Sequence, residues 1–123
     1  MRYKFLAGLA GIFAVSALAA SPECAHAFLD NSDPRVGSTV TTAPKTLTMK
    51  FTEALEVPFC TVAVTDSKGV SVTRGKPRAV PGHADELLVP LKISGPGLLQ
   101  VTWHALSVDT HKTEGHFSFT VAP

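Results

Sequence analysis

The sequence predicts an all-β protein, a single β-sandwich of about seven short strands joined by Greek-key connections. Two observations carry this prediction. Short segments rich in Val, Thr and Phe alternate apolar with polar residues, as half-buried strands do. Turn residues such as Gly, Pro, Asp and Ser separate these segments, and no stretch keeps a helical period. A small closed barrel is the alternative arrangement of the same strands.

The strands are predicted from period-two alternation, which is clearest where Leu47, Met49 and Phe51 share one face. The complete predicted set is 27–29, 47–52, 59–65, 70–73, 87–92, 98–106 and 117–121. Residues 74–86 hold two prolines, two glycines and mixed charge, so they are predicted to form a longer loop.

The first 25 residues are predicted to be a signal peptide that is removed, which leaves one exported domain of residues 26–123. Arg2 and Lys4 form a basic head, an uncharged apolar run follows at 6–20, and a short polar stretch comes next. An uncleaved membrane anchor is the alternative, but this run is shorter than the roughly 20 apolar residues that cross a bilayer.

The cleavage position decides which residue leads the exported chain. The triplet Ala25-His26-Ala27 fits the small-x-small rule when the cut follows Ala27. A cut after Ala25 makes His26 the first residue, but it puts Glu23 where the rule prefers a small residue. The rule favours the cut after Ala27, whereas the metal ligands described below favour the cut after Ala25, so both stay open.

Charge and cysteine content narrow the function further. Removal of Arg2, Lys4 and Glu23 leaves nine basic and nine acidic residues, so nothing indicates a nucleic-acid partner, which needs a basic face. Cys24 leaves with the signal peptide, and Cys60 then has no cysteine partner in the domain. The domain must therefore be stabilised by its hydrophobic core.

Asp109 and His111 are candidate metal ligands. They stand two apart between two predicted strands, and in extended backbone both side chains lie on one face. Imidazole suits copper and zinc, and a carboxylate adds neutralising charge. The alternative is a solvated hydrogen-bonded pair that holds no metal.

His26 completes the candidate site if it leads the chain. It then offers its α-amine, whose ordinary pKa is near 8, together with its ring Nδ1. With Asp109 and His111 this gives three nitrogens and one oxygen, a tetragonal set that Cu(II) prefers, although zinc accepts similar ligands. Cu(I) prefers sulfur, but Met49 lies within a strand and Cys60 alternates with core-facing valines.

Glu53 follows the strand at 47–52 and is a further candidate. It is interpreted as an additional oxygen ligand or as an acceptor that orients a metal-bound histidine, with an ordinary surface carboxylate as the alternative. The remaining histidines, His83, His104 and His116, are interpreted as surface residues.

Three ordered motifs resemble the CopC family of periplasmic copper-resistance proteins, over the whole region that follows the signal peptide. The motifs are His26-Ala27-Phe28-Leu29 with Ser32-Asp33-Pro34, then Phe51-Thr52-Glu53-Ala54-Leu55, then Trp103-x-x-x-Ser107-x-Asp109-x-His111-x-x-x-Gly115-x-x-x-Phe119-x-Val121. The third motif is the most specific.

The resemblance implies an immunoglobulin-like (cupredoxin-like) β-sandwich or barrel in the periplasm of a Gram-negative bacterium. It implies that His26, through its amine and ring, binds one Cu(II) together with Asp109 and His111, and Glu53 occupies the position of a further acidic group in some members. It also implies a copper carrier in resistance or homeostasis, whose partner is an inner-membrane copper transporter of the CopD type. The methionine loop of the two-site members is lacking, so the chain resembles the Cu(II)-only members. We expect a monomer without enzymatic activity.

Two other functions remain as alternatives. The first is a copper-dependent oxidase or monooxygenase with a histidine brace. Two observations argue against it: the Asp109 oxygen fills coordination space that oxygen chemistry needs, and Trp103 is the only tryptophan, so no aromatic platform for a polysaccharide is evident. The second is a β-sandwich interaction module that binds no metal.

Overall fold

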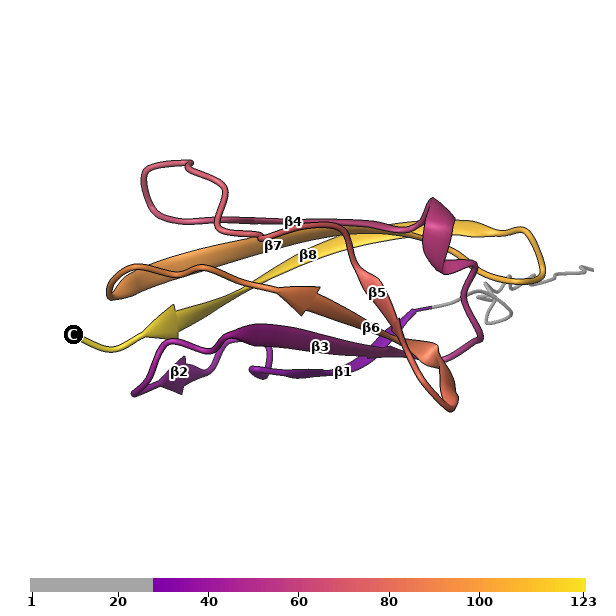
Figure 1. The fold of residues 1–123 in the computed structure, drawn as a ribbon, viewed down its shortest axis with the longest axis horizontal. Helices are drawn as coiled ribbons and strands as arrows, with labels where there is room; N and C mark the ends of the chain where they lie inside the picture. Colours follow the sequence, from indigo (N-terminus) through magenta and orange to yellow (C-terminus); the bar gives the residue numbers. More distant parts are fainter. Residues whose placement is uncertain (1–27) are drawn as a thin grey trace, which may run out of the picture.

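The computed structural model describes residues 28–123, which form a sandwich of two four-stranded sheets (Figure 1). The prediction of an all-β sandwich is confirmed, with eight strands in the described region where about seven were expected. Within residues 28–123, no helix is long and apolar enough to cross a membrane.

The first sheet has the strand order β1-β3-β6-β5. These strands are β1 (Leu29–Asp33), β3 (Thr46–Phe51), β6 (His83–Pro90) and β5 (Arg78–Val80). All neighbouring pairs are antiparallel, and β5 forms an exposed edge with an irregular register near its end.

The second sheet has the order β2-β8-β7-β4. Its strands are β2 (Thr39–Val40), β8 (Lys112–Val121), β7 (Gly97–Leu106) and β4 (Thr61–Thr65), and a short 3₁₀ turn, η1 (Val57–Phe59), precedes β4. The long β7–β8 hairpin pairs antiparallel over ten residues of each strand, whereas β2 runs parallel to β8. This hairpin is the rigid base from which the predicted metal-binding loop projects.

The core lies between the two sheets and is formed by the inward residues of the alternating strands. Phe51 of β3 and Trp103 of β7 meet edge to face across the layers, with ring centroids 5.0 Å apart at an interplanar angle of 79°. Phe117 and Phe119 are also buried, as expected, and so is Cys60, whose thiol donates to the carbonyl oxygens of neighbouring backbone. Burial raises the pKa of the Cys60 thiol.

One predicted strand is absent. The sequence predicts a strand at residues 70–73, but in the structure Ser71 makes an isolated bridge with Thr65 of β4 and Thr73 makes another with Leu91 beside β6. The segment crosses from one sheet to the other and extends neither. Of its two valines, Val72 is buried and Val70 is 56% exposed, so the alternation does not mark one continuous buried face.

Other strand bounds also differ from the prediction. β5 lies inside residues 74–86, which the sequence predicts as loop, because a short exposed edge strand has no apolar alternation to detect. β6 and β8 begin at His83 and Lys112, ahead of the expected starts at 87 and 117, since their first residues are largely exposed.

We predict that Gly115→Ala destabilises the fold. A Cβ atom at this position of β8 would stand 2.6 Å from Cζ2 of the buried Trp103, so the indole or the strand must shift. Overpacking of this kind costs about 1–3 kcal/mol, measurable as a lower midpoint of urea unfolding. Gly95→Ala is the control, because nothing lies within 4 Å of a Cβ there. Equal midpoints for the two variants would contradict the close approach of Gly115 to Trp103.

Candidate metal centre

Residues 52–56, the segment that follows β3, join the parts of the chain that carry the candidate ligands. The N–H of Thr52 donates to the carbonyl of Phe28 at 2.9 Å, and the N–H of Phe28 donates to the Thr52 hydroxyl at 3.0 Å. The N–H of Leu55 donates to the carbonyl of Ala84 at 2.9 Å. The segment therefore holds the beginning of the described chain and the beginning of β6 at one end of the sandwich.

The same segment also contacts the loop between β7 and β8. The N–H of Val108 donates to the carbonyl of Ala54 at 3.0 Å, and Leu55 pairs with Ser107 in an isolated antiparallel bridge. Figure 1 shows the start of β1 and the β7–β8 loop at the same, right-hand end of the molecule. Two regions that are about 80 residues apart in sequence thus approach each other through backbone hydrogen bonds.

The β7–β8 loop is a tight turn. Ser107 is fully buried, its N–H donates to the carbonyl of His111 at 3.0 Å, and its carbonyl accepts from the N–H of Thr110 at 2.9 Å. Thr110 has a positive φ of 72°, a left-handed conformation that is uncommon for a β-branched residue. The segment is therefore a turn and not the extended backbone that the sequence predicts, and this turn brings Asp109 and His111 together.

Asp109 and His111 lie side by side. Oδ1 of Asp109 is 3.2 Å from Nδ1 of His111 and 3.3 Å from the His111 backbone nitrogen, and the Ser107 hydroxyl donates to the same oxygen. The Asp109 and His111 side chains are 41% and 53% exposed. An imidazole and a carboxylate are thus adjacent and accessible from solvent on a turn with a buried anchor.

The surroundings of Asp109 favour its charged form. The hydrogen bond from Ser107 is the main cause that lowers the pKa of the Asp109 carboxyl below its ordinary value. Partial desolvation raises this pKa to a smaller extent, and the side chain and backbone of His111 lower it further. The carboxylate consequently stays anionic, as a metal ligand must be. Sequence reasoning did not assign Ser107 a role, although its spacing two residues before Asp109 was the available signal.

Glu53 occupies a different place from the Asp109–His111 pair. It is exposed and lines a shallow cleft together with Lys50, His83 and Asp85. Among residues 28–123 it makes no hydrogen bond or ion pair. The structure brings Glu53 to the same end of the sandwich as the β7–β8 loop, but its described surroundings are the start of β6.

His26, the fourth predicted ligand, lies outside the described residues, as does the predicted cleavage position. The first described residue, Phe28, forms two hydrogen bonds with Thr52. The other histidines of β7 and β8 are on the surface, as expected. The ring of His104 is 57% exposed and lies 3.1 Å from Glu114, and His116 is exposed.

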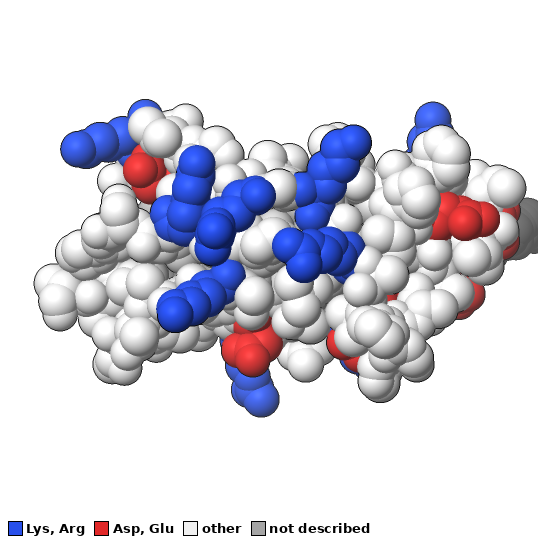
Figure 2. All heavy atoms as spheres, in the orientation of Figure 1, with Lys and Arg blue, Asp and Glu red and all other residues white. Residues whose placement is uncertain are grey.

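Charge is unevenly distributed over the molecule. Figure 2 shows most Lys and Arg side chains of one face over its middle and left, whereas acidic side chains are prominent toward the right-hand end. The β7–β8 loop lies at that end in the same orientation (Figure 1). The acidic side chains near this loop attract cations to it.

Comparison with known proteins gives the family. The model of the CopC domain matches residues 29–122, nearly all of the described chain. The chain belongs to the CopC domain family. This CopC domain is 37% identical over 98 residues to Protein YobA of Escherichia coli K12, an alignment that covers 79% of each chain.

Solved structures of similar sequence agree with this assignment. The crystal structure of CopC from Methylosinus trichosporium OB3b superposes with a TM-score of 0.74 at 28% identity, over 80% of this chain and 95% of that one. PcoC, a methionine-rich copper resistance protein from Escherichia coli, superposes with a TM-score of 0.66 at 30% identity, over 79% and 99% of the respective chains. The resemblance to the CopC family is confirmed, and so is the fold that it implies.

We predict that Ser107→Ala raises the pKa of Asp109 in the metal-free protein toward the ordinary value of about 3.9, because the largest lowering influence is removed. Since the folded-state pKa is lowered, the associated stabilisation is present above the ordinary pKa and is lost as pH falls through the lowered one. The measurement is an NMR titration of the Asp109 side-chain carboxyl signal.

Ser38→Ala is the control for this titration, because the Ser38 hydroxyl donates to the carbonyl of Arg35 and not to a carboxylate. We expect it to leave the Asp109 titration unchanged. An Asp109 pKa that is the same in Ser107→Ala as in the parent protein would remove Ser107 as the main cause.

Proposed function

We propose that this protein is a periplasmic carrier of one Cu(II) ion, bound by the α-amine and ring of His26, by Asp109 and by His111. The observation that carries the proposal is the adjacency of Asp109 and His111 on a turn that is hydrogen-bonded to residues 52–56. Two ligands that stand about 2 Å from one ion at a right angle are about 3 Å apart. The 3.2 Å between Asp109 Oδ1 and His111 Nδ1 is close to that spacing.

The reach of the chain supports His26 as the partner of this pair. Only Ala27 lies between His26 and Phe28, and a fully extended chain covers at most about 7 Å over these two residue steps. Phe28 is hydrogen-bonded to Thr52, and the next residues of the same segment are hydrogen-bonded to Val108, beside Asp109. This short reach from a segment that is also bonded to the loop is compatible with His26 as a ligand beside Asp109 and His111. This ligand set requires cleavage after Ala25, which leaves residues 26–123 as the exported domain.

The donor types favour Cu(II). Three nitrogens and one oxygen are the tetragonal set that this ion prefers, whereas Cu(I) takes thioether and thiolate ligands. The sulfur atoms of the described chain belong to Met49 and Cys60, and both residues are buried in the core. PcoC is described as methionine-rich, but this chain has only two methionines.

The cellular role that we propose is binding and delivery without catalysis. The relatives include copper resistance proteins, and the proposed recipient is an inner-membrane transporter of the CopD type. Trp103, the only tryptophan, is buried at 5% exposure and so offers no aromatic platform for a polymeric substrate. Glu53 is proposed as an acidic neighbour of the copper site that lies on the cleft beside it.

We predict that the secreted protein begins at His26 and binds the first Cu(II) equivalent tightly. Intact mass gives the first residue, and a Cu(II) titration against a competing chelator gives the affinity. We expect His111→Ala and Asp109→Ala each to lower the affinity for this first equivalent by about tenfold or more. We expect the same loss of affinity when an extra residue precedes His26. The extension blocks chelation by the amine without touching the fold.

His104→Ala is the matched control, because it removes an exposed histidine that also faces a carboxylate but lies away from the loop. We expect it to keep the first equivalent. A secreted chain that begins at Phe28, or equal affinity in all four variants and the parent protein, would refute the proposed site.

A further inference from the structure

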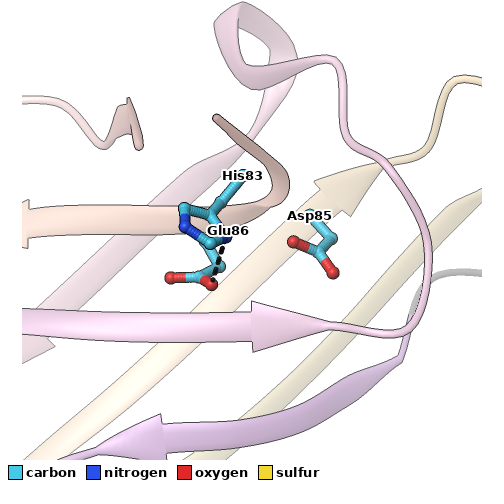
Figure 3. A group of neighbouring side chains, drawn as sticks. All are labelled: His83, Asp85 and Glu86. Carbon is cyan, nitrogen blue, oxygen red and sulfur yellow. Dashed lines mark ion pairs between the residues drawn. The ribbon is translucent and has the colours of Figure 1, made fainter. Parts of the chain in front are cut away.

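A second group of metal-ligating side chains lies at the beginning of β6. Within residues 28–123, His83, Asp85 and Glu86 are a group of three in which one ligand atom from each lies within 4.8 Å of the others. Figure 3 shows His83 and Glu86 in contact and Asp85 beside them, at the start of the same strand. Nδ1 of His83 is 3.3 Å from Oε2 of Glu86. His83 is exposed, as expected, but it is the first residue of β6 and not part of a loop.

The spacing of these atoms fits one small cation. Ligands on opposite sides of an ion that binds at about 2.1 Å stand about 4.2 Å apart, so atoms within 4.8 Å need only small side-chain movements to converge. One imidazole with two carboxylates suits the borderline divalent ions, among which Cu(II) binds most tightly at a given site. The side chains of His83 and Glu86 are 58% and 18% exposed, so an ion can reach them from solvent.

Glu53 adds a further oxygen donor to the same cleft. It lines this cleft together with His83 and Asp85 and has no hydrogen bond or ion pair within the described chain. Its place near β6 is fixed by the Leu55–Ala84 backbone hydrogen bond of 2.9 Å. Glu53 is not one of the three residues whose ligand atoms lie within 4.8 Å of one another, so it adds negative charge to the cleft beside the cluster.

Lys50 opposes cation binding at this cluster. Its ammonium is 3.1 Å from Oδ2 of Asp85, and this contact lowers the pKa of Asp85 and raises that of Lys50. A metal ion at the cluster must therefore either displace the Lys50 ammonium from Asp85 or bind despite its electrostatic repulsion. The ion pair has exposed side chains, 44% for Lys50 and 32% for Asp85, so solvent screens the repulsion but does not abolish it.

We propose a second, weaker Cu(II) site formed by His83, Asp85 and Glu86, with the Glu53 carboxylate adding negative charge nearby. It is separate from the proposed site at the β7–β8 loop and does not depend on the amino terminus. It is weaker because it offers one nitrogen instead of three and because Lys50 competes for Asp85. The two sites flank residues 52–56, which pair with Ala84 on one side and with Ser107 on the other.

The first experiment counts Cu(II) equivalents on the secreted protein and on the double variant Asp109→Ala/His111→Ala, in competition with glycine as a weak chelator. The double variant is made in a His26→Ala background, so that the amine and ring of His26 cannot form a chelate of their own. We expect the parent protein to bind a tight and a weak equivalent, and the double variant to keep the weak one. Adding His83→Ala to the double variant should weaken that equivalent about tenfold or more, whereas adding His104→Ala should not. Loss of the weak equivalent with His104→Ala, or its persistence with His83→Ala, overturns the second site.

The second experiment removes the competing cation. Lys50→Met in the double variant should tighten the weak equivalent by roughly two- to fivefold, the range expected for one partly exposed ion pair. Lys112→Met is the control, since Lys112 lies at the start of β8, on the other sheet. If Lys50→Met left the affinity for the weak equivalent unchanged or lowered it, Asp85 would not be a ligand of that ion. Neither result bears on the proposed function, which is tested separately by the affinity of the parent protein for its first Cu(II) equivalent.

Discussion

The structure of the candidate site depends on the backbone hydrogen bonds of residues 52–56. These residues follow Phe51, whose ring is fixed in the core against Trp103. Because the segment leaves β3 with its direction already set, its N–H and C=O groups meet Phe28, Ala84 and Val108 in defined register. The core thus determines where three distant parts of the chain meet, and the ligands are carried on those parts.

The loop that carries Asp109 and His111 is organised around a buried hydroxyl. Ser107 donates to the Asp109 carboxylate through its hydroxyl and to the His111 carbonyl through its backbone N–H. Both candidate ligands are therefore hydrogen-bonded to one fully buried residue. A cation that binds here replaces the contact between Nδ1 of His111 and the Asp109 oxygen, whereas the Ser107 contacts can remain. The Ser107 contacts thus hold these two side chains in place before an ion binds, which lowers the entropic cost of ordering them.

The sequence predicted those features that are encoded locally. Alternation identified β3 and β7 and the burial of Phe51, Trp103 and Cys60, and the Asp-x-His spacing identified an adjacent pair. The reason for that adjacency was wrong, because Thr110 adopts positive φ and forms a turn. The edge strand β5 has too few buried residues to be recognised. The surroundings of Glu53 depend on pairing between residues about 30 apart, which no local pattern contains.

The two proposed copper sites lie on either side of one segment, and this placement has an electrostatic consequence. Ala84, Leu55 and Ser107 lie on neighbouring hydrogen-bonded segments, so the backbone segments that carry the two proposed sites are roughly 10 Å apart, two inter-strand spacings. Two divalent ions at that distance repel by about 1.7 kcal/mol in water before screening, and salt reduces this, since the Debye length is about 8 Å at physiological ionic strength. If both proposed sites hold an ion, occupation of the weaker one therefore lowers the affinity of the other for its ion.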